Sequence, residues 1–192
     1  MADDRALLPA LKNRDPNAFA ELFNRYSDKL FRVAFGILND EADAEGVVQD
    51  AFLKLIENLD SFEARSTLGT WLYRVTYNAS LDRLRRQRPH APLADDFQDD
   101  ADYMPAIFLD WSHAPETHFS TAEKNRVLAE AISKLPLKLQ ATFILREIDG
   151  LSTAETAAVL NISPGAVKVQ LHRARLQLRE LLSAYFQERI TP

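Results

Sequence analysis

Residues 89–122 are the stretch that most restricts how this chain can fold. They contain four prolines and seven acidic residues, and neither lysine nor arginine occurs among them. Proline lacks the backbone donor that a helix interior needs, so this density of proline interrupts regular structure. We therefore predict an acidic linker between folded parts at residues 1–88 and 123–192. The linker is either a solvated tether or a strip whose apolar side chains, such as Trp111, lie on another surface.

Both flanking parts have the periodicity of helices. Their apolar residues recur at intervals of three and four, and no run alternates as a half-buried strand would. In the N-terminal part we expect four helices. Asp15 followed by Pro16 predicts the start of one, and Asn39–Asp40 separates it from the next, over about 41–58. The fourth covers residues 69–88. The predicted fold class is all-α, with two small helical domains joined by the linker.

The C-terminal part has the local signals of a helix-turn-helix. Ser152 and Glu155 have the spacing of a capping box, so a short helix is expected to start at Thr153. Asn161 tolerates the left-handed conformation that ends a helix, and Pro164 suits the first turn of the next one. Two helices joined by about four residues form the helix-turn-helix arrangement. The helices expected in this part cover about 123–135, 137–148, 153–161 and 164 onward.

The second helix of the expected helix-turn-helix is basic. Residues 164–179 carry four positive charges and no acidic residue. In this motif the second helix enters the major groove, where Lys and Arg reach phosphates or guanine acceptors and Val can contact a thymine methyl. The alternative is a surface helix with a solvated basic face. The candidate contacts are Lys168, Val169, His172, Arg173 and Arg175.

A second candidate surface lies on the helix expected at 69–88. A polar stripe that begins with an aromatic side chain runs along it, between two apolar faces. Trp and Arg can stack on exposed bases, while Arg and Asn can contact phosphates or base edges. From the residues alone, an equally good interpretation is that Trp71 caps the core and the arginines are solvated. The stripe consists of Trp71, Arg74, Asn78, Asp82 and Arg85.

Composition excludes several classes of chemistry. The chain has no cysteine and four histidines, none of them three or four residues apart, so we expect no redox chemistry, metal site or cofactor. The acidic residues of 89–122 have no His or Cys partner, so an enzyme is a weak interpretation. The charged N-terminus lacks the apolar segment of a signal peptide, and no apolar run is long enough to cross a bilayer. We therefore expect a cytoplasmic protein without membrane insertion.

Three stretches together resemble RNA polymerase sigma factors of the extracytoplasmic-function group. FEARSTLGTWLYRVTYNASLDRLRR, residues 62–86, is similar to that family's −10 recognition segment. LREIDGLSTAETAAVLNISPGAVKVQLHRARLQLRE, residues 145–180, is similar to its −35 reader. DEADAEGVVQDAFLKLIENL, residues 40–59, is similar to the segment that docks on the polymerase. The resemblance covers nearly the whole chain, with the three segments in the family's order.

The resemblance implies a transcription initiation factor that brings core RNA polymerase to promoters and promotes strand opening. Its expected partners are the β′ coiled coil and β flap of the polymerase, promoter DNA and an anti-sigma factor. The residues carried over by the resemblance fall into three sets. The polymerase-binding set is Asp43, Gln49 and Asp50. The −10 set is Phe62, which would hold a flipped base, with Trp71, Arg74, Asn78 and Arg85. The −35 set adds Arg146 to the five residues of the basic helix.

Two further expectations concern how the chain acts. The alternative function is a dimeric helix-turn-helix regulator that is not a polymerase subunit, which leaves the stripe at residues 71–85 unexplained. In addition, the linker carries a charge of −7 and residues 164–179 carry +4. Opposite charges on joined parts predict weak, salt-sensitive masking of the DNA-binding helix in the free protein.

Overall fold

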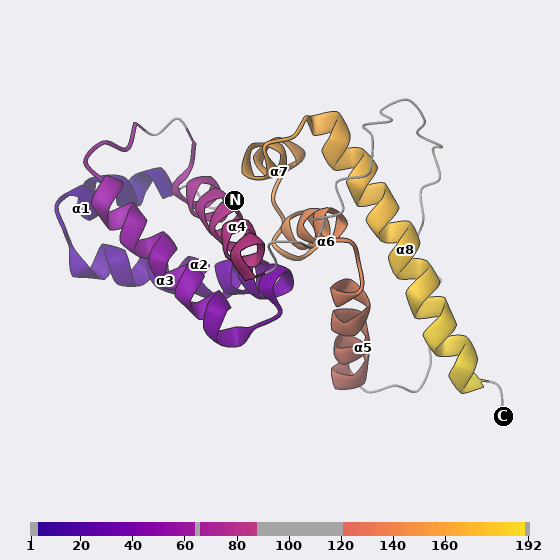
Figure 1. The fold of residues 1–192 in the computed structure, drawn as a ribbon. Helices are drawn as coiled ribbons and strands as arrows, with labels where there is room; N and C mark the ends of the chain where they lie inside the picture. Colours follow the sequence, from indigo (N-terminus) through magenta and orange to yellow (C-terminus); the bar gives the residue numbers. More distant parts are fainter. Residues whose placement is uncertain (1–3, 64–65, 88–120, 191–192) are drawn as a thin grey trace.

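All the regular structure described for this chain is helical. The computed structural model describes residues 4–63, 66–87 and 121–190. Within them the predicted all-α fold class is confirmed (Figure 1). Residues 88–120, with nearly all of the acidic linker, lie outside the described residues, so the predicted masking by the linker stays a prediction. In chain order the helices are η1 (Asp4–Leu7), α1 (Leu8–Lys12), α2 (Pro16–Leu38), α3 (Glu41–Asn58), α4 (Leu68–Gln87), α5 (Thr121–Ser133), α6 (Leu137–Phe143), η3 (Ile144–Ile148), α7 (Thr153–Leu160) and α8 (Pro164–Ile190).

Short-range capping signals begin and end these helices as the sequence predicts. Asp15 accepts a hydrogen bond from the Asn17 amide at 2.9 Å and begins α2. Ser152 and Glu155 form both bonds of the capping box at the start of α7. Partial burial alone would raise the pKa of Glu155, but the hydrogen bonds from Ser152 outweigh it and lower that pKa. Asn161 ends α7 in the left-handed region, with φ of 56°.

Helices α2, α3 and α4 form the core of the N-terminal part. Their facing sides are lined by leucine, valine and tyrosine, and the ring of Tyr26 meets that of Tyr73 edge-on with centroids 6.3 Å apart. Aromatic pairs in this geometry add about 0.5–1.5 kcal/mol to the gain from burial. The most deeply buried side chains here are Leu22, Tyr26, Leu30, Leu55, Leu72 and Tyr73.

The C-terminal part differs from the sequence prediction at one point. The helix expected over 137–148 is α-helical only as far as Phe143 and continues as the π-helical turn η3. The amide of Asp149 donates to the Ile144 carbonyl at 2.9 Å, which closes the wider turn. A single π-helical turn is too short to produce a recognisable spacing of apolar residues, so the sequence does not indicate it. One face of α8 is apolar and packs into the core, where Val167, Ala174 and Leu178 are fully buried.

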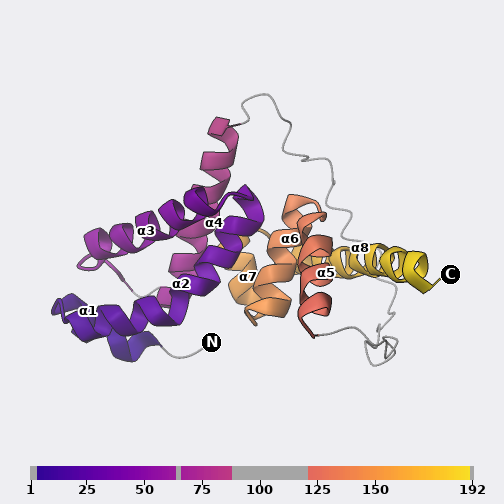
Figure 2. The same ribbon diagram turned by 90° about the horizontal axis from the view of Figure 1, so that it is seen from below.

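The N- and C-terminal helices pack against each other. Helix α7 lies beside α4, and α6 lies beside α2 (Figures 1 and 2). Gly36 of α2 allows a close approach, because a Cβ atom there would lie 2.9 Å from the Cδ1 atom of Ile144 in η3. An ion pair joins the same surfaces, since Arg32 Nη2 lies 2.7 Å from Oδ1 of the completely buried Asp149. Within the described ranges, no helix is both long and apolar enough to cross a membrane.

Candidate nucleic-acid interface

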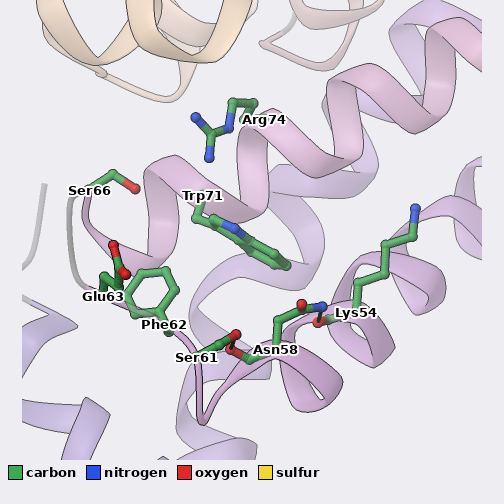
Figure 3. A pocket seen from close by; sticks show the side chains of 8 residues that line it. All are labelled: Lys54, Asn58, Ser61, Phe62, Glu63, Ser66, Trp71 and Arg74. Atoms are coloured by element: carbon green, nitrogen blue, oxygen red, sulfur yellow. Dashed lines mark hydrogen bonds between the residues drawn. The ribbon is translucent and has the colours of Figure 1, made fainter.

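A pocket of about 350 Å³ lies where the end of α3 meets the beginning of α4. One wall comes from the last turns of α3, another from the first turns of α4, and the segment between the two helices closes one side (Figure 3). Its lining combines two aromatic rings with two cationic, one acidic and three small polar side chains. The lining residues are Lys54, Asn58, Ser61, Phe62, Glu63, Ser66, Trp71 and Arg74.

The two aromatic side chains of the pocket hold each other in place. The rings of Phe62 and Trp71 lie with centroids 6.4 Å apart and planes at 86°, and both side chains are half-buried. On the opposite wall, Nδ2 of Asn58 donates to the Lys54 carbonyl at 2.7 Å, which fixes the orientation of the Asn58 amide. The pocket therefore offers aromatic surface for stacking and polar groups for hydrogen bonds. This combination suits an unstacked nucleobase.

The polar stripe of α4 continues from this pocket. Beyond Trp71, the side chains of Arg74, Asn78 and Arg85 are exposed along one face of the helix. Arg85 forms an exposed ion pair with Asp82 at 3.2 Å. The structure thus brings four of the five predicted −10 residues onto one line, and the fifth, Phe62, into contact with the first of them. An exposed row of cationic and amide side chains can follow a nucleic-acid strand.

The predicted −35 residues of α8 differ in their exposure to solvent. Lys168 is exposed near the start of α8, while Val169, His172 and Arg173 are half-buried on the following turns. Arg175 pairs with Glu147 at 2.8 Å. These five residues come from the segment of the motif that reads base edges in the major groove.

Arg146 differs from the other predicted −35 residues. It lies in the π-helical turn η3, is half-buried, and donates from its guanidinium to the Leu151 carbonyl. That bond ties η3 to the turn that precedes α7. A contact between Arg146 and DNA stays a prediction, and it would have to use the guanidinium nitrogens that are not engaged with Leu151.

Two of the three predicted polymerase-binding residues are exposed, and the third is engaged within the protein. Gln49 and Asp50 are exposed on α3. Asp43 is half-buried and binds both Arg83 and Gln87 of α4. Its carboxylate therefore joins α3 to α4, and its contact with polymerase stays a prediction.

Five residues of the pocket were not among the sequence-based candidates. Lys54 and Asn58 are one turn apart at the end of α3, directly before Phe62, which is a weak signal for a shared wall. The partner wall from α4 is a tertiary feature that no local pattern reveals. The five residues are Lys54, Asn58, Ser61, Glu63 and Ser66.

A second, larger cavity lies between the two helical parts. This groove has a volume of about 670 Å³ and is bounded by α2 and α4 on one side and by α5 and α6 on the other. Most of its lining is apolar, so it suits the apolar face of a helix. Its larger apolar side chains are Phe31, Phe35, Leu81, Ile132, Leu137 and Ile148.

Comparison with known families matches both helical parts. The Sigma-70 region 2 family matches residues 22–90, and the Sigma-70 region 4 family matches residues 125–178. These spans contain the pocket, the stripe and the helix-turn-helix.

Similar proteins cover nearly the whole chain. The extracytoplasmic-function sigma factor SigW of Bacillus subtilis is 32% identical over 179 residues, which are 90% of this chain and 92% of SigW. The sigma-E factor of Escherichia coli is 32% identical over 173 residues, 90% of each chain. Among solved structures, CnrH in complex with the cytosolic domain of CnrY is similar, with a TM-score of 0.67, 28% identity, and coverage of 95% of this chain and 99% of the CnrH chain.

Proposed function

The chain belongs to the sigma-70 family, in its extracytoplasmic-function group, and we propose a specific role in initiation for each surface described above. As a member of this family it is a transcription initiation factor that works with RNA polymerase. We assign −10 recognition and strand opening to the pocket and stripe of the N-terminal part. We assign −35 recognition to α8. The action is binding and strand separation in the cytoplasm, while the covalent chemistry is that of the polymerase.

In the proposed mechanism, one base of the −10 element leaves the stack and occupies the pocket. Extruding a base costs a few kcal/mol. Stacking on an aromatic side chain returns about 1–3 kcal/mol, so contact with Trp71 can offset much of that cost. The exposed Arg74 and Asn78 would then hold the displaced strand beside the pocket. The open state is stabilised without any chemical step in this chain.

The observation that carries this proposal is that the pocket leads directly into the polar stripe of α4. The general test is run-off transcription from a genomic library with core polymerase, with and without this chain. We expect new transcripts that start at fixed sites only when the chain is present. Equal transcripts in both reactions would contradict the proposal. A dimeric regulator that works without polymerase would leave both the pocket and the region 2 match unexplained.

We also propose that an anti-sigma factor occupies the groove between the two helical parts. The similar structure of CnrH contains the cytosolic domain of CnrY, and the sigma factor RpoE of Bartonella quintana was solved with the anti-sigma factor NepR. The apolar lining, which includes Phe35 and Ile148, suits an apolar helix from such a partner.

The exposed face of α3 is tested by reversing one charge. Asp50→Lys is expected to weaken binding to core polymerase about tenfold, because a complementary charge becomes a like charge at the contact. Asp50 is exposed, so the fold should be unaffected. Titration of core polymerase with labelled protein measures the affinity. The control is Asp28→Lys, the same change at an exposed position of α2. Equal affinities for the two variants would exclude Asp50 from the contact.

The stripe is tested at its amide side chain. Asn78→Ala is expected to reduce open-complex formation about fivefold, which corresponds to about 1 kcal/mol for one hydrogen bond. Permanganate reactivity of the opened thymines measures this, and a pre-melted template should restore part of the loss. The control is Asn24→Ala, which removes an exposed amide side chain of α2 outside the pocket and the stripe and should not reduce opening. An equal loss on duplex and pre-melted templates would contradict a role limited to opening.

A further inference from the structure

The N-terminal helix η1 contributes a fully buried carboxylate to the beginning of α4. Asp4 is completely buried, and its side chain reaches both α2 and α4. Its Oδ1 lies 2.7 Å from Arg25 Nη1. Its Oδ2 accepts hydrogen bonds from the Tyr26 hydroxyl and, at 3.2 Å, from the amide of Gly69. One side chain thus binds two residues of α2 and the first turn of α4.

The surroundings leave little freedom for this contact. A Cβ atom on Gly69 would lie 2.7 Å from ring atoms of Tyr26, so α4 approaches α2 as closely as a glycine permits. Tyr26 is 1% exposed, and burial followed by the hydrogen bond to Asp4 raises the pKa of its hydroxyl, which therefore remains a donor. The hydrogen bond that Arg25 donates to Asp4 raises the pKa of Arg25, which remains charged. A carboxylate at the beginning of a helix also interacts favourably with the helix dipole.

The Gly69 amide that Asp4 binds is close in sequence to the residues of the pocket between α3 and α4. Gly69 stands two residues before Trp71 on α4, and Ser66 and Arg74 of the pocket belong to the segment on either side. The opposite wall comes from α3. The orientation of the first turn of α4 therefore decides the width of the pocket, and Asp4 is the charged group that fixes this turn against α2.

We propose that Asp4 is a positioning residue for the pocket: by binding the amide of Gly69, it holds Trp71 where an extruded base can stack. This inference rests on the proposed function of the pocket. Binding sites lose much of their affinity when supporting residues let them shift by a fraction of an ångström. Asp4 touches neither DNA nor polymerase in this scheme, so it should affect binding of the single strand and leave polymerase docking on α3 unchanged.

The experiment compares two affinities of the full chain. The first is for core polymerase. The second is for a short single-stranded DNA pool that has been enriched, from random sequence, on the unmodified protein bound to core polymerase. Asp4→Ala is expected to weaken binding of this DNA about tenfold and to change the polymerase affinity less than about twofold. Asp4→Asn keeps one acceptor for the Gly69 amide but turns its NH2 group toward the Arg25 guanidinium, so it should restore only part of the DNA affinity.

Control variants separate positioning from general damage. Glu21→Ala removes the exposed partner of Arg25 and leaves Asp4 in place, so it should change neither affinity. Asp4→Ala combined with Trp71→Ala should bind DNA no more weakly than Trp71→Ala alone, whereas unfolding would add a further loss. If Asp4→Ala fails to fold, Tyr26→Phe, which removes one donor to the same carboxylate, tests the same contact with an expected smaller loss.

Two results would overturn the inference, and they are distinguishable from failure of the pocket itself. Unchanged DNA affinity in folded Asp4→Ala, with a loss in Trp71→Ala, would refute the role of Asp4 and leave the pocket intact. Parallel losses of DNA and polymerase affinity in Asp4→Ala would show a general structural role instead. Unchanged DNA affinity in Trp71→Ala would refute the proposed function of the pocket and the inference with it.

Discussion

Replacing Arg32 by alanine is expected to separate the two helical parts of the free protein while each part stays folded. Arg32 places Nη2 at 2.7 Å and Nε at 3.3 Å from one oxygen of Asp149, whose side chain is completely buried. Removing one member of a buried pair leaves a charge without a partner, at a cost of about 3–5 kcal/mol. Arg32 is 43% exposed, so we expect the lower end of this range or less. When the two parts separate, water reaches the Asp149 carboxylate and relieves the cost of its unpaired charge.

The size of the effect follows from this cost. A loss of about 1.4 kcal/mol changes the ratio of molecules with packed parts to molecules with separated parts tenfold. Arg32→Ala should therefore change this ratio by about tenfold to a hundredfold in favour of the separated form. The radius of gyration from small-angle scattering measures the shift. Burial and then the charge of Asp149 raise the pKa of Tyr73 on α4, so this hydroxyl remains protonated beside the carboxylate and is not a second source of charge.

Three further variants make this prediction specific. Arg126→Ala removes an exposed ion pair within α5 and should leave the radius unchanged. Arg32→Ala combined with Asp149→Leu removes both charges. It should restore the packing of the two parts to some extent, because no buried charge remains without a partner. Gly36→Gln should open the parts by a different route, since the new side chain would meet Ile144 across the contact. An unchanged radius in both Arg32→Ala and Gly36→Gln would contradict the packing of α2 against η3 and Asp149.

Trp71→Ala is expected to reduce promoter opening about tenfold to a hundredfold. The substitution removes the larger aromatic wall of the pocket and the edge-on partner of Phe62. Loss of one base–aromatic stacking contact is worth about 1–3 kcal/mol, which corresponds to this range. Trp71 is half-buried at the rim of the core, so the thermal unfolding temperature should fall only slightly. Permanganate reactivity at a promoter found by the library experiment measures opening.

The matched variants for Trp71 are Trp71→Phe and Phe62→Ala. Trp71→Phe keeps an aromatic face and should retain most of the promoter opening. Phe62→Ala should reduce promoter opening more than Trp71→Phe does and less than Trp71→Ala does. Polymerase affinity should be unchanged in all three, because these residues do not lie on the exposed face of α3. Opening that stays normal in Trp71→Ala would contradict stacking in the pocket.

Local chemistry explains why much of this fold was predictable from sequence. Helix ends are set by residues within a few positions of each other, such as Ser152 with Glu155, or Asp15 with Pro16, and these pairs form the expected contacts. The apolar residues of α4 repeat at helical spacing, so its buried faces also followed from the pattern. The same reasoning placed the polar stripe that begins at Trp71.

What could not be predicted depends on contacts between distant residues. Arg32 and Asp149 lie 117 positions apart, and neither has a neighbour in sequence that indicates the other. Asp43 was expected only to face polymerase, whereas it binds two side chains of α4. Asp4 looked like an ordinary charge near the N-terminus until the fold placed it against Gly69. Charged side chains that satisfy each other across helices leave no periodic signal.

If Asp50 contacts polymerase as proposed, helix α3 sets the distance between that contact and the pocket. Its exposed face carries Asp50, proposed to contact polymerase, and its last residue is Asn58 at the rim of the pocket. Eight residues of α-helix span about 12 Å. The distance from the polymerase contact to the extruded base would then be fixed by one rigid helix and would be the same at every promoter. On this proposal, the position of the extruded base relative to polymerase would be set by the length of α3 and not by the DNA sequence.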